Sequence, residues 1–304
     1  LGMKSTSRAT LARVNKQQPA ALYETMYYQL LEKCRCFAPS HSFSFKSKLY
    51  LLDATTIDLC LSAFPWAQFR KRKGAIKLHV GLDADGYLPT FMDMTDGKWH
   101  ESKWAKTLTL PKGSFTVFDK GFTDYGWYEN LTKNEIFFVT RLKSNADVEY
   151  LLKRAGRKSP GITNDQKIKL NRVSDPLRLV TYIDPETGKE YRYVTNAHHL
   201  KAIEIADIYK ERWQIEQFFK WIKQNLKIKT FFGTSRNAVL TQVWIALCVY
   251  LLVAYHNFKS RLGISMHQLL RVIQLNLFTR RNFTELFQPP DKQLINSPQL
   301  LLWN

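Results

Sequence analysis

Between residues 46 and 97, hydrophobic and polar residues alternate in runs that are typical of β-strands. The runs KLYLLDATTIDL, AIKLHVGLDADG and YLPTFMDMTDG follow one another, and Asp85 and Gly86 separate the second from the third. An Asp-Gly pair between alternating segments is a strong signal for a tight hairpin turn. Because strands joined by tight turns run antiparallel, the pattern predicts three antiparallel strands.

The next segments follow the order helix, strand, helix, strand. A helix is predicted at about Glu101 to Leu108, a strand at residues 115–118, a second helix at residues 124–133 and a second strand at residues 136–141. Two strands connected through a helix usually lie parallel in one sheet. The sequence therefore predicts a mixed sheet, in which a parallel layer lies beside the antiparallel strands.

Downstream of this sheet the pattern changes twice. Residues 142–196 combine charged and turn residues with short alternating segments, which predicts a β-rich insertion. Apolar residues at helical spacing predict long helices at residues 200–226 and 238–259, and the segment after Pro289 is predicted to be irregular. Together these patterns predict an α/β fold with a mixed sheet flanked by helices.

The two ends of the chain differ from this central region. Residues 1 to about 40 are basic and carry apolar residues at helical spacing. Because the chain opens on Leu1 in polar, basic sequence, we expect that an upstream domain is missing. We therefore predict an N-terminal helical segment that is a remnant of that domain or a linker to it (1–44), one α/β domain (45–260) and a C-terminal tail (261–304).

The charge of the chain narrows the classes of partner. Lys and Arg number 45 against 26 Asp and Glu, a formal net charge of +19. Since a basic surface gains affinity by releasing counterions from a phosphate backbone, nucleic acid is the expected partner, with a membrane surface second. The apolar run Val243 to Tyr255 is shorter than the roughly 20 residues that cross a bilayer, which favours a buried core helix. No signal-peptide pattern opens the chain, so a cytoplasmic protein without membrane contact is expected.

Cysteines, histidines and one basic cluster are not predicted to have catalytic or metal-binding roles. The four cysteines are too few and too unevenly spaced for a disulfide framework or a paired zinc motif. His79 lies inside a predicted strand and His100 precedes a predicted helix, where a histidine is more often structural. Basic residues 70–73 contact DNA backbone without sequence preference or form a solvated loop.

Two aspartates follow apolar strand residues. Asp53 is predicted to close the strand at residues 48–52, and Asp119 to close the strand at residues 115–118. Carboxylates at the ends of neighbouring strands can share a divalent cation, which prefers oxygen ligands. Taken singly, each aspartate is better explained as a turn-capping residue.

A polar stripe runs along the helix predicted at residues 200–226. At about 100° per residue, Tyr209, Glu216 and Lys223 repeat every seventh position and share one face. Arg212 lies one turn before Glu216 on the same face. The adjacent stripe is apolar and is predicted to bury the helix against the sheet; it consists of Ile215, Phe219, Ile222 and Leu226.

A glutamate beside arginine, lysine and tyrosine suits a site that binds both metal and phosphate. The alternative is a solvated helix with an ordinary Arg-Glu pair four residues apart. Three aromatic residues on the same basic helix, Trp213, Phe218 and Trp221, are difficult to place in solvent.

The polar stripe also matches a known signature. Tyr209, Arg212, Glu216 and Lys223 fit the pattern Y-x2-R-x3-E-x6-K, and further matching blocks are LLDATTIDL, VFDKGF and RWQIEQFFKWIKQNLKIKTFFGTS. In these blocks the sequence resembles bacterial insertion-sequence transposases of the retroviral-integrase superfamily, in insertion-sequence family four. The resemblance spans residues 5–259 and has the blocks in the same order.

The resemblance implies a fold, a catalytic triad and a reaction. The implied fold is RNase-H-like, with the β-rich insertion before the helix that carries Glu216. The implied DDE triad is Asp53, Asp119 and Glu216, which would hold two divalent ions, Mg²⁺ or Mn²⁺. The implied reaction is cleavage of DNA at the ends of an insertion sequence, followed by strand transfer to a target.

The same resemblance implies a DNA partner. Tyr209, Arg212 and Lys223 match residues that contact the DNA backbone at the element end. Because two ends are brought together, a homodimer on double-stranded DNA is the expected assembly. The alternative is a truncated or inactive product that only binds DNA or inhibits a full-length partner.

Relatives of this type can stack an aromatic residue of the insertion on a flipped base. Residues 142–196 contain no Trp. Tyr182, Tyr191 or Tyr193 could substitute, although ordinary strand packing is favoured for each of them.

Overall fold

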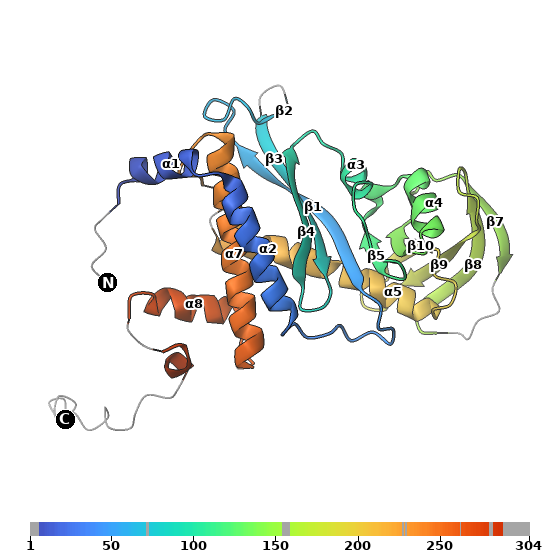
Figure 1. The fold of residues 1–304 in the computed structure, drawn as a ribbon. Coiled ribbons are helices and arrows are strands. Elements are labelled where there is room, and N and C mark those ends of the chain that lie inside the picture. Colours follow the sequence, from blue (N-terminus) through green and yellow to red (C-terminus); the bar gives the residue numbers. More distant parts are fainter. Residues whose placement is uncertain are drawn as a thin grey trace, which may run out of the picture.

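The computed structural model describes residues 6–70, 73–153, 159–226, 228, 230–261, 263–279 and 282–287. Within these residues, ten strands form one mixed sheet that crosses the molecule (Figure 1). Neighbouring strands follow the order β2-β3-β1-β5-β6-β10-β9-β8-β7, and β4 pairs with β3. The strands are β1 (Leu49–Leu59), β2 (Gln68–Arg70), β3 (Lys73–Asp83), β4 (Leu88–Asp96), β5 (Phe115–Phe118), β6 (Phe137–Arg141), β7 (Val148–Lys153), β8 (Ile162–Leu170), β9 (Leu177–Ile183) and β10 (Glu190–Thr195).

Strands β1, β3 and β4 form the antiparallel side of the sheet. β3 pairs antiparallel with both β1 and β4, which confirms the three antiparallel strands predicted from alternation. The turn between β3 and β4 contains Gly86 at φ +67°, where a Cβ atom would lie 2.9 Å from the ring of Phe258. Glycine fits this left-handed and crowded position without strain, which explains the Asp-Gly turn signal.

The centre of the sheet is parallel. β1 pairs parallel with β5, and β5 pairs parallel with β6. α4 (Tyr125–Lys133) connects β5 to β6, and its N-cap Asp124 accepts a hydrogen bond of 3.0 Å from the backbone N–H of Trp127. The predicted strand-helix-strand unit is therefore confirmed. α3 (Glu101–Ala105), which precedes this unit, is shorter than the helix predicted there.

Strands β7 to β10 form the predicted β-rich insertion. They pair antiparallel with one another, and β10 pairs antiparallel with β6, so the insertion continues the main sheet. Figure 1 shows these strands at the opposite end of the molecule from the N- and C-terminal helices. The predicted α/β class, a mixed sheet flanked by helices with a β-rich insertion, is confirmed.

Two hydrophobic cores lie on the two faces of the sheet. Successive side chains of a strand point to opposite faces, so Leu51 belongs to one core and Leu52 to the other. The first core contains α2 (Ala20–Arg35), α5 (Ala202–Glu211), α6 (Trp213–Asn225) and α7 (Arg236–Ser260), and the second contains α3 and α4.

The single helix predicted at residues 200–226 is wrong, because the chain forms two helices, α5 and α6. They meet at Arg212, whose dihedral angles stay helical at φ −53° and ψ −27°. The backbone N–H of Arg212 bonds to the carbonyl of Tyr209 at 3.1 Å, three residues back instead of four. This tighter turn is typical of short 3₁₀ interruptions, which often mark functional positions.

Helices also form at both ends of the described chain. α1 (Arg8–Gln17) precedes α2, which buries Tyr27, Leu31 and Cys34 in the first core. α8 (Met266–Asn276) and the 3₁₀ helix η2 (Phe283–Phe287) lie within the tail, where no helix was predicted. The segment after Pro289, predicted to be irregular, lies outside the described residues.

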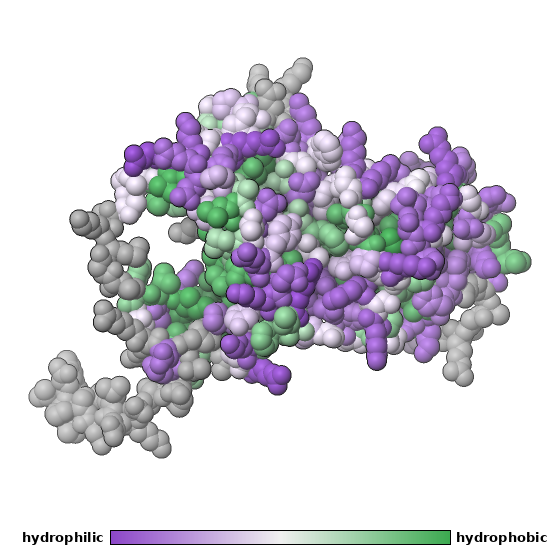
Figure 2. Space-filling model, in the orientation of Figure 1, coloured by the Kyte–Doolittle hydropathy of each residue, from purple (hydrophilic) through white to green (hydrophobic). Residues whose placement is uncertain are grey.

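α7 has the length and composition of a membrane span, which corrects the estimate based on its shorter apolar run. It has 25 residues, and its most apolar window has a mean hydropathy of 2.0. However, 67% of that window is buried inside the protein, as expected of a core helix. Figure 2 shows hydrophobic surface gathered at the α7 and α8 end of this view and mostly hydrophilic surface over the insertion.

Candidate active site

Asp53 and Asp119 lie side by side on two parallel strands. In the pairing of β1 with β5, Leu52 lies opposite Phe118, and each aspartate is the next residue of its chain. Neighbouring strands are about 4.8 Å apart, so the two carboxyl groups leave the backbone at adjacent points. The structure therefore brings together the two aspartates that the sequence singled out.

Asp53 does not close a strand, which corrects the prediction. β1 continues to Leu59, and only its neighbour β5 ends at this level. Residues 49–52 of β1 are buried, whereas residues 53–56 are half-buried. Beyond Leu52, β1 has no parallel neighbour, because β5 ends at Phe118. Asp53 therefore lies within a continuous strand and beside the place where β5 ends, which is called the groove.

Glu216 approaches the same place from the first turn of α6. The guanidinium of Arg212 donates to Asp53 Oδ2 at 3.2 Å and also donates to Glu216, so that one cation joins the two carboxylates. α6 is fixed against the sheet by Ile215, Phe219 and Ile222, which are buried as predicted. The helix thus holds Glu216 beside Asp53.

Asp119 is held by two other groups. It accepts a hydrogen bond from Arg141 Nη2 at 2.6 Å and one from the hydroxyl of Tyr209 at 3.3 Å. Arg141 was not recognised in the sequence. Its place follows from the β5–β6 register, in which Phe118 pairs with Thr140 and the next residues of the two chains are Asp119 and Arg141.

Lys223 and Tyr209 also lie near the point where β5 ends. Lys223 Nζ donates to the hydroxyl of Thr55 and, at 3.1 Å, to the carbonyl of Thr56 in β1. The ring of Tyr209 lies under two guanidinium groups, with Arg141 and Arg212 at 5.7 and 5.8 Å from its centre. All four residues of the polar stripe thus meet the end of β5 or the middle of β1.

The two aspartates have opposite pKa shifts. Burial raises the pKa of Asp53 to about 6; the nearby Glu101 and Glu216 act in the same direction, while the Ala54 N–H and Arg212 oppose it. For Asp119, burial also raises the pKa, but the hydrogen bond and charge of Arg141 outweigh it and the net pKa is lowered. Asp119 is therefore the more readily ionised of the pair.

The carboxylates suit a divalent cation by their chemistry, although a guanidinium now joins two of them. Among the residues that the structure describes, no three His, Cys, Asp or Glu side chains are placed to hold one metal ion. Asp53 and Glu216 nevertheless converge on one cationic group, that of Arg212. Carboxylate oxygens are the ligands that Mg²⁺ and Mn²⁺ prefer. The donor set is therefore chemically suited to such an ion, while in this structure the Arg212 guanidinium lies between Asp53 and Glu216.

A cleft of about 860 Å³ opens next to these carboxylates. One side is formed by Arg141, Tyr209 and Arg212, and the other by residues of β9, β10 and the turn between them. Trp213, at the rim, is 57% exposed. The insertion thus supplies one wall of the cleft, which includes the acidic residues Asp184 and Glu186.

Three tyrosines of the insertion line this cleft. The ring of Tyr193 lies 4.8 Å from that of Tyr209, and Tyr191 is stacked parallel to Tyr193 at 6.0 Å. Tyr182 and Tyr193 are buried, which agrees with the favoured role in strand packing, whereas Tyr191 is half-buried. Of the three tyrosines that line the cleft, Tyr191 therefore has the most accessible ring.

Other sequence candidates have structural positions. His79 is buried, shares a hydrogen bond of 2.8 Å with Thr95 Oγ1 and stacks on Trp104. Burial lowers its pKa to about 4. His100 is the N-cap residue of α3, and all four cysteines are free. Of the basic residues 70–73, positions 71 and 72 lie outside the described residues.

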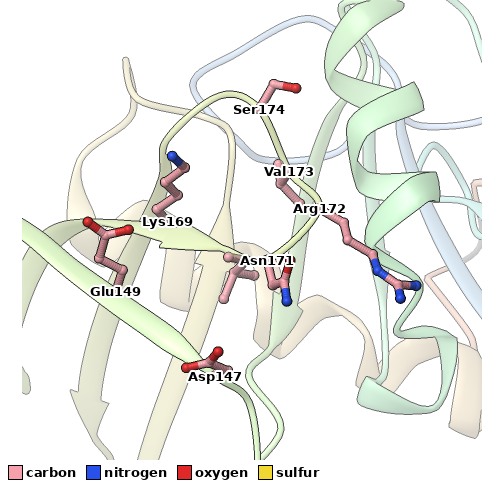
Figure 3. A pocket seen from close by; sticks show the side chains of 8 residues that line it. Asp147, Glu149, Lys169, Asn171, Arg172, Val173 and Ser174 are labelled. Carbon is pink, nitrogen blue, oxygen red and sulfur yellow. The ribbon is translucent and has the colours of Figure 1, made fainter.

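A second hollow, of about 460 Å³, lies at the far edge of the sheet (Figure 3). Its lining includes Glu149 of β7 and Lys169 of β8, which oppose each other across the two strands. In Figure 3, Arg172 points away from Glu149. The order of strands places β6, β10 and β9 between β8 and β5, so this hollow is separate from the carboxylates.

Comparison with known proteins gives consistent matches. A family model described as "Transposase DDE domain" matches residues 44–252. Over 295 residues, 94% of this chain and 82% of the relative, the chain is 30% identical to a protein of Sinorhizobium fredii named as a transposase, y4zB. It is 28% identical over 273 residues, 87% of this chain and 72% of the relative, to a Geobacillus stearothermophilus protein named as a transposase for insertion sequence element IS5377. A chain of the piggyBac transposase synaptic complex with hairpin DNA has a TM-score of 0.49 and 14% identity, over 83% of this chain and 56% of that one.

Proposed function

Because this chain belongs to the family of transposase DDE domains, we propose that Asp53, Asp119 and Glu216 are its catalytic carboxylates. They would hold two divalent ions, Mg²⁺ or Mn²⁺. When bound, these ions supply an activated nucleophile and a Lewis acid for attack on a phosphodiester bond. The proposed reaction is cleavage at insertion-sequence ends and transfer of the released strand to target DNA.

The meeting of three distant segments carries the proposal. β1, β5 and α6 each bring one carboxylate to the groove where β5 ends. Arg212 contacts Asp53 and Glu216, and Tyr209 contacts Asp119, so that α5, α6 and the sheet are joined through these side chains. Carboxylates this close repel one another unless cations lie between them. A site for divalent cations explains why the chain gathers them.

We propose that Tyr209, Arg212 and Lys223 contact the DNA backbone at the element end. Arg212 and Lys223 are cationic and lie at the groove, and a planar guanidinium is suited to phosphate. Burial raises the pKa of Tyr209 to about 12, so its hydroxyl remains a donor at neutral pH. A phosphate that enters the groove would take Arg212 from the carboxylates and leave these to the metal.

The cleft beside the carboxylates is the proposed path of the DNA end. Its basic residues match the net charge of the chain, and its exposed rings can stack on unpaired bases. Because the reaction joins two element ends, we propose that a homodimer assembles on double-stranded DNA, in the bacterial cytoplasm. The alternative of an inactive product that only binds DNA is not favoured, since each signature residue is present at the groove.

The test is cleavage of labelled element ends in Mg²⁺ or Mn²⁺. Asp53→Asn, Asp119→Asn and Glu216→Gln should each reduce cleavage by about 10³-fold or more, because each removes a charged metal ligand. Binding of the same DNA should persist, because the basic residues are retained. Cleavage is measured at saturating DNA, and binding is measured by titration of the same DNA, both with the whole chain.

Asp58→Asn is the matched control, because Asp58 lies on the same strand but is exposed. It should leave cleavage unchanged. If one of the three triad variants retained near-normal cleavage, that residue would not be a ligand. If wild-type protein neither cut nor joined DNA with either metal, the proposed enzyme would be wrong.

A further inference from the structure

Glu101 is a fourth carboxylate at the groove, and it approaches from the face of the sheet opposite to Glu216. It lies in the first turn of α3, which packs in the second core, whereas α6 packs in the first. Neither the signature nor the alternation of residues selects it. Its position is set by packing between distant parts of the chain.

Glu101 Oε2 lies close to Gly121, two residues after Asp119. Gly121 belongs to the 3₁₀ helix η1 (Lys120–Phe122), which begins directly after Asp119. A Cβ atom on Gly121 would lie 2.9 Å from Glu101 Oε2. Since real Cβ atoms essentially never come so close to a neighbour, a side chain at position 121 would force the end of the Glu101 side chain to shift.

The charge of Glu101 also reaches Asp53. It contributes to the raised pKa of Asp53, ahead of the contribution of Glu216. Glu101 is thus electrostatically coupled to one aspartate and in van der Waals reach of the turn that follows the other. Glu216 and Glu101 therefore approach the two aspartates from opposite faces of the sheet.

Lys77 holds Glu101 in this position. Lys77 Nζ lies 3.3 Å from Glu101 Oε1 and donates at 3.0 Å to the carbonyl of Trp99. The lysine side chain is 15% exposed, so its charge is only partly screened by solvent. This arrangement parallels Arg212 with Glu216, in which a basic side chain also neutralises a carboxylate at the groove.

We propose that Glu101 is a positioning residue of the catalytic centre, which strengthens divalent-cation binding at Asp53 and Asp119, and that Lys77 is its counter-ion when no cation is bound. This inference rests on the proposed function. The competing explanation is a structural ion pair that ties α3 to β3 and has no influence on metal binding.

The two explanations predict different signs for two substitutions. If Glu101 supports cation binding, Glu101→Gln should weaken Mn²⁺ binding about tenfold, the size typical of residues that support metal ligands. Lys77→Met should strengthen it, by about threefold, because a competing positive charge is removed. A structural pair predicts that both variants lose the same ion pair and leave Mn²⁺ affinity unchanged.

The experiment is calorimetric titration of the full chain with Mn²⁺, without DNA. Glu32→Gln is the matched control, because Glu32 is an exposed glutamate paired with Arg35 on α2. It should bind Mn²⁺ as wild type does. Thermal unfolding in EDTA should shift equally little in the Glu101 and Lys77 variants, which shows that both fold.

Gly121→Ala gives an independent check. The added methyl group would push the Glu101 carboxylate away and should weaken Mn²⁺ binding in the wild-type background. In the Glu101→Gln background the same change should cost less, because the charge that it displaces is already absent. Equal losses in both backgrounds would overturn the role of Glu101, as would unchanged affinity in Glu101→Gln or a shift of the same sign in Lys77→Met.

Asp53→Asn separates this inference from the proposed function. If Asp53→Asn weakens Mn²⁺ binding and Glu101→Gln does not, only the role of Glu101 is wrong. If neither Asp53→Asn nor Asp119→Asn changes Mn²⁺ binding, the metal site itself is misplaced and the proposed function fails with it.

Discussion

Two adjoining regions of the molecule consist of different kinds of side chain. The carboxylate centre consists of Asp53, Asp119 and Glu216 with Arg141 and Arg212, and it is made of opposite charges that neutralise one another. The tyrosine cleft consists of Tyr182, Tyr191 and Tyr193 with Lys210, and it is made of stacked rings. Lys210 lies over the ring of Tyr182, and Lys189 lies over the ring of Tyr191. Tyr209 belongs to both, since its hydroxyl contacts Asp119 and its ring contacts Tyr193.

This difference distinguishes a region suited to catalysis from a region suited to DNA binding. The ion pairs of the carboxylate centre suit a site where phosphate can replace the carboxylates at the arginines and metal ions can replace the arginines at the carboxylates. Rings and an exposed lysine suit a surface that binds bases and backbone without reacting. Substitutions in the carboxylate centre should therefore reduce the rate of cleavage at saturating DNA, and those in the tyrosine cleft should reduce affinity for DNA.

Arg212→Ala should have the largest effect among the basic residues. It removes a guanidinium that is 13% exposed and that would stabilise phosphate in the reaction, so cleavage at saturating DNA should fall about 100-fold. Mn²⁺ binding without DNA should persist, because the three carboxylates remain. The measurements are single-turnover cleavage and metal titration.

Arg271→Ala is the control for Arg212, because Arg271 is an exposed arginine on α8. Its cleavage rate should equal that of wild type. If Arg212→Ala lost DNA affinity but kept its rate of cleavage at saturating DNA, Arg212 would act in DNA binding and not in catalysis.

The pKa of Asp53 predicts a dependence of stability on pH in metal-free protein. Its pKa is raised from 3.8 to about 6, so the contribution of Asp53 to the free energy of unfolding should be greatest below pH 4 and should be lost as pH rises through 6. The expected fall is about 2 kcal/mol, reduced from the full shift because Asp53 is 20% exposed. Urea unfolding in EDTA at several pH values measures it.

The two aspartates should give opposite slopes. Asp53→Asn should remove the decline between pH 4 and 6. Asp119 has a lowered pKa, so its contribution is present at neutral pH and is lost as pH falls towards that pKa. Asp119→Asn should therefore destabilise the protein at pH 7. Equal slopes in the two variants would contradict the assignment of Arg141 to Asp119.

The sequence predicts most of the frame because the signals of strands and turns are local. Alternation along β1 and β3 and the glycine at position 86 determine the antiparallel side without knowledge of distant contacts. Periodicity also places Glu216 and its three companions on one face. It does not show the change of helix at Arg212, because the dihedral angles remain helical and only the hydrogen bonding changes.

Features that depend on neighbouring strands are less visible. The end of the apolar run at Asp53 was interpreted as the end of its own strand, whereas it marks the end of β5 next to it. Arg141 and Glu101 reach the groove through strand register and helix packing between distant segments. No local pattern contains that information.

Tyr191→Ala should weaken binding of element ends that have unpaired bases by about tenfold, because stacking on one ring contributes roughly 1–3 kcal/mol per base. Cleavage at saturating DNA should be unchanged. Tyr150→Ala is the control, since Tyr150 is also in the insertion and is 55% exposed, but it lies on β7. Equal losses in the two variants would indicate a general effect on the insertion and not a contact in the cleft.

Lys210→Ala should have the smallest effect and the most specific signature. Lys210 lies 4.9 Å from the ring centre of Tyr182, and its side chain is 52% exposed, so it can contact one phosphate. Affinity should fall about threefold, and the slope of log affinity against log salt should decrease by about 0.9. Tyr191→Ala should leave that slope unchanged, because stacking releases no counterions.

Lys112→Ala is the control for charge alone, because Lys112 is an exposed lysine paired with Glu135. If the Lys112 variant changed the slope as much, the cleft would hold DNA only through the net charge of the protein.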